Sequence, residues 1–348
     1  MPDAAARDLL VVDNVRKSFV KRRSWRQVIR HPLATEHVEA LRGVSISVRE
    51  GEFFGLLGAN GAGKTTLMKV IATLMLPDAG RVTVEGADAE RDPVAVRGRV
   101  ALSLASERGL FWRLDARENL RLFAVLSGVP TAEVGDRVEE SLGAVGMRDT
   151  GLRMVSEFSS GMVQRLLIAR ALVARPRVLL LDEPTRSLDP ITARDFRAFL
   201  RRELSGRGCA VLLATHNTDE AFDLCDRVAV MERGQVLATG RAHDLAAALH
   251  GRRFEVETTV EGEQFLRAAA GRGLVGEVMP RPDGESTPGA WVRVMLTVVG
   301  DDVPASGAGL VAALVAAGHP VASCAPVATS LADLIQSVVS GSRTSGAA

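Results

Sequence analysis

Residues 58–66 read GANGAGKTT and match the pattern G-x-x-x-x-G-K-[ST]. The apolar run FFGLL precedes this stretch, and KTTLMKVIATLM (64–75) follows it with the pattern of a helix. This order predicts a phosphate-binding loop, because small residues let backbone N–H groups and the helix N-terminus face phosphate oxygens. We expect the whole loop to bind nucleotide phosphates, through Gly58, Ala59, Asn60, Gly61, Ala62, Gly63, Lys64, Thr65 and Thr66.

Charged and hydroxyl side chains near this loop have chemistry that suits phosphate transfer. Lys64 should reach the β- and γ-phosphates, and Thr65 should ligate Mg²⁺. Further along, the apolar run VLLL (178–181) is followed directly by Asp182 and Glu183. A carboxylate at a buried strand end can hold Mg²⁺, so Asp182 is predicted to serve the metal. Glu183 is predicted to act as the general base on the attacking water.

A histidine follows another apolar run. His216 comes directly after CAVLLAT (209–215), which reads as a strand. Ligands of open α/β sheets bind at the carboxyl ends of the strands. We therefore expect His216 to sense the γ-phosphate and to take part in catalysis beside Glu183.

A small, hydroxyl-bearing turn lies shortly before the Asp-Glu pair. Residues 157–165 read EFSSGMVQR and lead into the basic helical pattern VQRLLIARAL (163–172). Together with the phosphate loop, this turn resembles the signature loop of the ATP-binding cassette (ABC) ATPase family, which is usually Leu-Ser-Gly-Gly-Gln. The likeness covers residues 8–240. It implies that the turn contacts ATP bound by a second subunit, through Ser159, Ser160, Gly161 and Met162, of which Ser160 and Met162 depart from the usual pattern.

The resemblance implies further roles. Ser187 and Asp189 in SLDP match the loop of the family that contacts the other cassette of a dimer. The glutamine that normally reaches Mg²⁺ is replaced by Ser106, with Glu107 beside it. Either Glu107 takes that role as a metal ligand, or the contact is altered.

The adenine platform of the family is usually an aromatic ring before the phosphate loop. The chain has no tyrosine, so Phe19 is the expected stacking residue, with Trp25 as second choice. Both lie in or near a segment, residues 16–31, that has no acidic residue. This segment is equally compatible with contact to anionic lipid headgroups and with a solvated loop.

The order of strand-like and helical patterns predicts the fold class. The order indicates an α/β domain with a helical insert, followed by a small α+β ferredoxin-like domain whose β-α-β-β-α-β order begins after Gly251. The resemblance implies that the α/β domain is a P-loop NTPase of the ABC type. Within the first part, VSISVREGEFFGLL (44–57) reads as a strand. The predicted division is a flexible N-terminus (1–7), an ABC ATPase domain (8–240) with the insert at about 107–175, a linker (241–251), the small accessory domain (252–341, ending in a helix at 330–341) and a disordered tail (342–348).

Composition limits the classes of function. The 348 residues carry a formal net charge of +1, which gives no basic footprint for nucleic acid. Three widely spaced cysteines favour a reducing compartment without a disulfide framework. There is no visible secretory signal, and no apolar run approaches the ~18–20 residues of a membrane span. If the protein works at a membrane, we expect its partner to cross it.

The resemblance implies an ATPase with ATP and Mg²⁺ as cofactors. We expect the ATP-hydrolysing subunit of an ABC transporter, located peripherally on the cytoplasmic side of the cell membrane. Its expected partners are membrane-spanning permease subunits and a second cassette, either another copy or a paralogue. The small C-terminal domain favours an exporter. The alternative is a soluble ABC-type ATPase that acts on nucleic acid or the ribosome, and a small-molecule kinase is a third option.

Overall fold

The computed structural model describes residues 7–20, 37–104, 109–206, 208–242, 244–245, 253–270, 275–278, 291–298 and 307–326. The chain forms two compact units, Met1–Ala242 and His243–Ala348. The boundary falls inside the predicted linker. Among the described residues, no helix combines the length and apolar character needed to cross a membrane.

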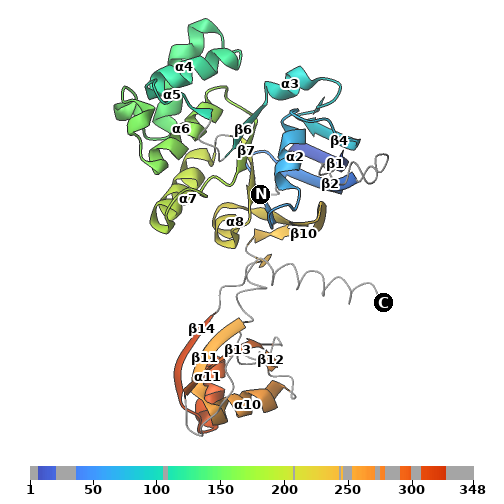
Figure 1. Ribbon diagram of the computed structural model, residues 1–348, viewed down its shortest axis with the longest axis vertical. Coiled ribbons are helices and arrows are strands. Elements are labelled where there is room, and N and C mark those ends of the chain that lie inside the picture. The colour runs from blue at the N-terminus through green and yellow to red at the C-terminus, as the bar shows by residue number, and fades with distance from the viewer. Residues whose placement is uncertain are drawn as a thin grey trace, which may run out of the picture. The chain divides into compact units, whose positions relative to one another are not determined.

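The first unit is built on a mainly parallel sheet of six strands in the order β10-β9-β3-β8-β7-β6 (Figure 1). All neighbours except the β9–β10 pair run parallel. The central strands are buried along their length, as expected when helices cover both faces of a parallel sheet. The strands are β3 (Phe53–Gly58), β6 (Val100–Leu104), β7 (Val178–Asp182), β8 (Ala210–Thr215), β9 (Arg227–Glu232) and β10 (Gln235–Arg241).

A second, antiparallel sheet of four strands lies beside it in the order β2-β1-β4-β5. Its strands are β1 (Asp8–Val20), β2 (His37–Arg49), β4 (Ala79–Val84) and β5 (Ala87–Asp88). One apolar core joins residues of both sheets and of helix α2 (Lys64–Ile71), including Val44, Leu67 and Leu180. This shared core holds the phosphate loop between the two sheets.

Two predicted elements have different bounds in the structure. The prediction of one strand over residues 44–57 is wrong, because a turn at Gly51, with φ 71°, separates β2 from β3. The strands then enter different sheets. The helix predicted over residues 64–75 ends at Ile71, since Thr73 takes a left-handed backbone with φ 56°.

Helices complete the first unit. The helical insert contains α4 (Ala116–Leu126), α5 (Val134–Ala144) and α6 (Ser160–Leu172), with short 3₁₀ turns at Thr131–Glu133, Arg148–Thr150 and Val155–Glu157. Asp115 and Glu118 start α4 with reciprocal capping hydrogen bonds. The other helices are α3 (Pro93–Arg97), α7 (Pro190–Leu204) and α8 (Thr218–Leu224). Figure 1 shows α4, α5 and α6 grouped on one side of the unit and α2 on the other.

The second unit has a four-stranded antiparallel sheet in the order β12-β13-β11-β14. Its elements are β11 (Arg253–Thr259), α10 (Val260–Ala270), β12 (Val275–Val278), β13 (Trp291–Val298), α11 (Gly307–Ala316) and β14 (Val321–Pro326). A separate apolar core includes Val256, Leu266, Val294 and Leu314. This order supports the ferredoxin-like classification, which stays our proposal. The predicted terminal helix at 330–341 lies outside the described residues.

Candidate active site

The phosphate loop connects β3 to α2. Gly63 is the N-cap of α2 with φ 105°, and no side chain of the described residues caps the helix start. A Cβ on Gly63 would lie 2.5 Å from the carbonyl oxygen of Ala40 in β2, so only glycine fits there. The uncapped N–H groups of α2 are therefore free to bind an anion.

Lys64 is buried against the loop that it follows. Its Nζ donates to the carbonyl oxygens of Gly58 at 2.6 Å and Ala59 at 3.2 Å. Burial lowers the pKa of the Lys64 ammonium, and the nearby carboxylates of Glu183 and Asp182 act in the opposite direction. A cation held this way can exchange its carbonyl partners for phosphate oxygens.

Thr65 and Asp182 meet although they lie on different elements. The Thr65 hydroxyl donates to Asp182 Oδ2 at 2.9 Å. Burial raises the pKa of Asp182, with the charge of Glu183 adding to the effect, whereas the Thr65 hydrogen bond and Lys64 oppose it. A buried carboxylate beside a hydroxyl is an oxygen donor set that fits Mg²⁺, which usually takes one or two protein ligands together with substrate phosphates. Accordingly, no cluster of three or more His, Cys, Asp or Glu side chains suited to a metal occurs among the described residues.

Glu183 and His216 form a pair at the carboxyl ends of β7 and β8. His216 Nδ1 lies 2.7 Å from Glu183 Oε1. Glu183 is buried, its φ is 50°, and its N–H donates to the carbonyl of Ala214 in the neighbouring strand. A non-glycine residue at this φ is held by its surroundings rather than by its own preference. The structure thus brings the predicted base and the predicted γ-phosphate sensor together.

The signature turn lies at the start of α6. Ser159 is the N-cap of this helix, and its Oγ accepts the N–H of Met162 at 3.4 Å. Ser159 and Ser160 are exposed, and Gly161 is half-buried. Among the residues that the structure describes, no hydrogen bond joins residues 158–162 to the phosphate loop.

The predicted dimer loop packs beside this turn. Asp189 caps α7 by accepting the N–H groups of Ile191 and Thr192 at 3.1 Å each. These hydrogen bonds, above all those with Thr192, lower the pKa of Asp189. A Cβ on Gly161 would lie 3.2 Å from Thr192 Cγ2, so the signature turn and the start of α7 touch. Ser187 is exposed in the same loop.

The register of β1 and β2 places the proposed adenine platform near the phosphate loop. Phe19 pairs with Val38, and Ala40 two residues later contacts the loop at Gly63. The Phe19 side chain is 38% exposed, which leaves a ring surface for stacking. Trp25, Ser106 and Glu107 lie outside the described residues, so their predicted roles stay predictions.

Sequence reasoning missed a buried carboxylate beside the site. Glu220 in α8 is 1% exposed, and its Oε1 accepts the hydroxyl of Thr185 at 2.7 Å. Asn217 is the N-cap of α8, so the order Asn-x-x-Glu has the pattern of a capping box. The sequence pattern therefore suggests a capping role that Glu220 does not have, because the Asn217 N–H donates to Thr215 Oγ1 and not to Glu220.

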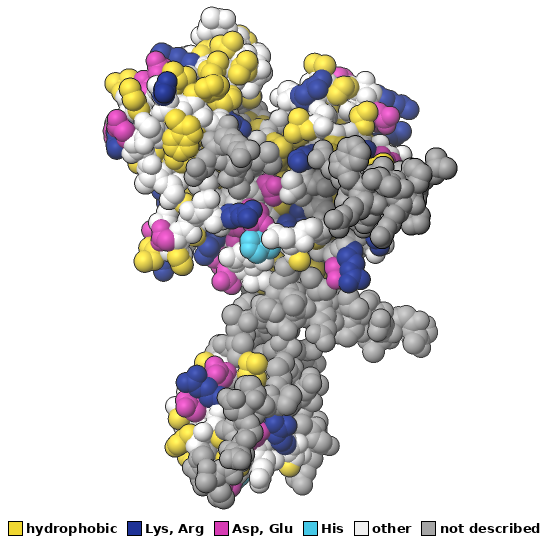
Figure 2. All heavy atoms as spheres, in the orientation of Figure 1, with side chains coloured by type: hydrophobic (Ala, Val, Ile, Leu, Met, Phe, Trp, Pro, Cys, Tyr) yellow, Lys and Arg dark blue, Asp and Glu magenta, His cyan; other side chains and the backbone are white. Residues whose placement is uncertain are grey.

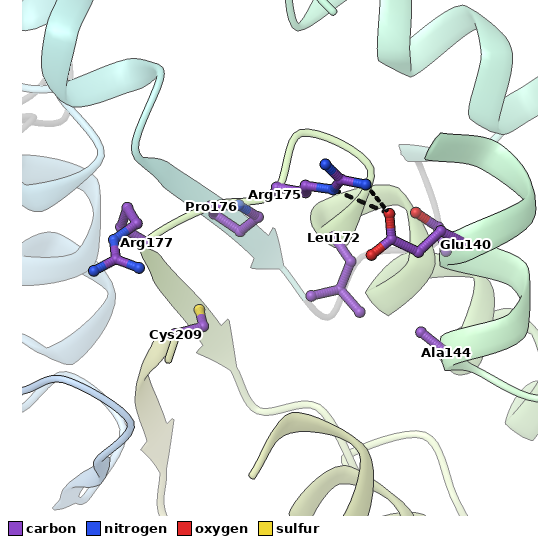
Figure 3. A pocket seen from close by; sticks show the side chains of 8 residues that line it. Glu140, Ala144, Leu172, Arg175, Pro176, Arg177 and Cys209 are labelled. Carbon is purple, nitrogen blue, oxygen red and sulfur yellow. Dashed lines mark hydrogen bonds and ion pairs between the residues drawn. The ribbon is translucent and has the colours of Figure 1, made fainter. Parts of the chain in front are cut away.

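A cavity of 360 Å³ lies at the opposite ends of these strands (Figure 3). It is lined by the ion pair of Arg175 and Glu140 and, across Pro176, by Arg177 and Cys209. Arg177 directly precedes β7 and Cys209 directly precedes β8. Burial raises the pKa of the Cys209 thiol to about 11, which makes it a poor nucleophile. This cavity is separate from the phosphate loop.

Comparisons with known proteins identify relatives of this chain that are named as ATP-binding proteins. The family model described as "ABC transporter" matches residues 41–186. The ABC transporter ATP-binding protein NatA of Bacillus subtilis (strain 168) is 39% identical over 208 residues, which cover 60% of this chain and 84% of NatA. The daunorubicin resistance ATP-binding protein DrrA3 of Streptomyces coeruleorubidus is 41% identical over 225 residues, 65% of this chain and 71% of that protein.

Among solved structures, the ADP conformation of MJ1267, an ATP-binding cassette of an ABC transporter, matches with a TM-score of 0.55 and 26% identity. The match covers 68% of this chain and 91% of that one. Relatives of this chain include proteins named for import, such as that of methionine, and for export, such as that of Nod factor. The fold, the phosphate loop with its paired carboxylates and these likenesses lead to one conclusion: the chain belongs to the ABC transporter ATP-binding proteins and is the ATP-binding, ATP-hydrolysing subunit of such a transporter.

Proposed function

We propose that this ATPase works as a head-to-tail pair of cassettes and powers a separate membrane-spanning permease, in the direction of export. The observation that carries the pairing is the separation of two anion-binding helix starts within one chain. The start of α2 bears the phosphate loop, and the start of α6 bears the exposed Ser159 and Ser160. A second subunit brings its α6 to the ATP that α2 holds.

In each site, one subunit binds and activates ATP. Lys64 exchanges its loop carbonyls for the β- and γ-phosphates, and Phe19 stacks on the adenine. Thr65 and Asp182 would hold Mg²⁺, which when bound neutralises phosphate charge. Glu183 accepts a proton from the attacking water, and His216 keeps the carboxylate of Glu183 oriented toward it.

The other subunit completes the site. The N-terminus of its α6 and the hydroxyl of Ser159 supply partial positive charge and a donor for the γ-phosphate. Gly161 leaves room for close approach, and Ser160 and Met162 flank it. Ser187 and Asp189 belong to the adjoining loop, and the exposed Ile191 in the first turn of α7 gives apolar surface for the subunit contact. The second subunit is another copy of this chain or a paralogue.

A surface hollow supports the permease as a partner. The hollow has a volume of 830 Å³ and lies between α3 and the helical insert. Its rim carries the exposed apolar side chains of Leu74, Val94 and Leu126. Figure 2 shows further hydrophobic side chains gathered over the part of the unit that holds α4 and α5. Exposed apolar surface of this kind fits a protein partner, so we place the chain peripherally at the cytoplasmic side of the membrane, with no nucleic acid as partner.

Export is supported by two features. The relative named for daunorubicin resistance is similar to this chain. In addition, a second unit with a ferredoxin-like strand order follows the cassette. The alternative of an ATPase that acts on nucleic acid is set aside, because the family is that of transporter subunits.

A mixing experiment tests the shared site. Lys64→Ala removes the phosphate-binding lysine, and Ser159→Arg blocks the signature turn, so each variant alone has no complete site. Mixed pairs contain one site made of an intact loop and an intact signature turn. Random pairing then restores about a quarter of wild-type ATPase activity. Activity equal to the sum of the two separate variants would contradict the shared site.

A further inference from the structure

Glu220 is buried next to the catalytic pair without being part of it. Burial raises the pKa of its carboxyl, and hydrogen bonds from Thr215 and Thr185 oppose this shift, as does the charge of Arg197. The hydroxyl of Thr185 lies 2.7 Å from Glu220 Oε1. Burying an ionisable side chain until it is 1% exposed costs free energy of folding, so the buried position of Glu220 needs an explanation.

The two threonines belong to the two segments that carry the catalytic pair. Thr185 comes two residues after Glu183, and Thr215 comes directly before His216. The backbone pairing of β7 with β8 ends at Asp182 and Ala214, followed by the bond from the Glu183 N–H to Ala214. Beyond that point, the Glu220 carboxylate joins the two segments again, because it accepts hydrogen bonds from both Thr185 and Thr215.

Helix capping does not explain this carboxylate. In a capping box, the side chain of Glu220 would accept the N–H of Asn217. Here Thr215 Oγ1 accepts that N–H at 3.0 Å, and the side chain of Asn217 accepts the N–H of Glu220 at 3.2 Å. The start of α8 is thus satisfied without the carboxylate, which turns to Thr185 instead.

Glu220 also borders the proposed reaction centre. A hollow of 520 Å³ is lined by Glu220, Thr185, Glu183 and His216, together with Asn60 of the phosphate loop. Glu183 has a φ of 50° and needs support from its neighbours. We propose that Glu220 is a positioning residue that clamps Thr185 and Thr215 and so holds the general base Glu183 against His216. This inference rests on the proposed roles of Glu183 and His216.

Thr185→Val tests the clamp, because valine keeps the shape of threonine and removes only the hydroxyl. The clamp predicts that kcat falls about tenfold while the KM for ATP stays within about twofold, since the loss concerns the chemical step. Thr185→Ser, which keeps the donor, retains kcat within about threefold.

Thr258→Val is the matched control. Thr258 lies in the second unit, is fully buried, and donates to the carbonyl of Pro320 at 2.7 Å. The same atoms are therefore removed from a buried hydrogen bond, and kcat should not change. Thermal unfolding of every variant separates a folding defect from a lost clamp, and Thr185→Val fails the proposal if its kcat falls no more than that of Thr258→Val.

A double variant tests whether the clamp acts through the contact between Glu183 and His216. In a His216→Ala background, the effect of Thr185→Val on single-turnover hydrolysis should shrink to less than about threefold. A full tenfold loss in that background overturns the proposal. Glu183→Gln is measured in parallel: if it hydrolyses ATP at the wild-type rate, the proposed role of Glu183 fails, whereas an inactive Glu183→Gln beside an unchanged Thr185→Val rejects the clamp alone.

Discussion

The Thr65 hydroxyl donates to Asp182 Oδ2 at 2.9 Å, although the two residues lie 117 positions apart. Thr65 belongs to the first turn of α2, and Asp182 ends β7. The contact aligns a hydroxyl and a carboxylate beside the phosphate loop. It also places the proposed metal-binding pair near Lys64 and Glu183, whose charges both influence the pKa of Asp182.

Asp182→Asn should weaken the use of Mg²⁺. Removing the carboxylate charge takes away the stronger of the two oxygen donors, so the Mg²⁺ concentration for half-maximal ATPase activity rises by about tenfold or more. A titration with Mg²⁺ at fixed ATP measures this. Thr65→Ser keeps the hydroxyl and serves as the control, and an unchanged Mg²⁺ midpoint for Asp182→Asn would remove Asp182 from the metal site.

Asp182→Asn should also change the pH dependence of stability. Because burial raises the pKa of this carboxyl, the folded chain binds its proton more tightly than the unfolded chain. The contribution to stability is present below the unfolded pKa and is lost as pH rises through the higher folded pKa. Without nucleotide, Asp182→Asn should therefore unfold at a higher temperature than wild type at neutral pH, with a difference that fades toward about pH 4.

Asp189→Asn should instead unfold at a lower temperature than wild type at neutral pH, the opposite change to that of Asp182→Asn. Hydrogen bonds at the start of α7 lower the pKa of Asp189. Its contribution is present above the unfolded pKa and is lost as pH falls through the lower folded pKa. Thermal unfolding across pH compares the two variants, and a loss of stability at neutral pH in both would refute the role given to burial at Asp182.

Gly63→Ala and Gly61→Ala form a matched pair in the phosphate loop. Both glycines have a positive φ, 105° and 84°, so each alanine costs about 1 kcal/mol for the backbone alone. Only at Gly63 would the new Cβ meet a carbonyl, that of Ala40 at 2.5 Å. Gly63→Ala should lose about 2 kcal/mol more in free energy of unfolding. Urea denaturation measures both, and equal losses would contradict the steric argument.

Glu183→Gln should trap a pair of cassettes with ATP bound. Glutamine fills the same space and can still accept from His216, but it cannot take the proton of the attacking water. With ATP and Mg²⁺, size-exclusion chromatography should shift the variant to twice the mass of one chain. Adding Lys64→Ala to it should abolish the shift, and a Glu183→Gln chain that stays monomeric with bound ATP would argue against the shared site.

Much of the fold was readable from local patterns. The α/β order of the first part and the alternation of strands and helices after Gly251 follow from hydrophobic periodicity, which depends only on near neighbours. Strand pairing could not be read this way. The separation of β2 and β3 into different sheets depends on the turn at Gly51 and on which surfaces the shared core covers.

The sequence by itself determined the residues whose chemistry depends on contiguous spacing: the loop that ends in Lys64, the pair Asp182 and Glu183, and the turn at Ser159. Their geometry is fixed within one strand end, one turn or one helix start. Only the tertiary structure decided that Glu183 meets His216 and that Glu220 reaches Thr185 instead of capping its own helix. Those contacts join segments that lie 33 and 35 residues apart, and the pairing of β7 with β8, together with the packing of α8 on β8, brings them together.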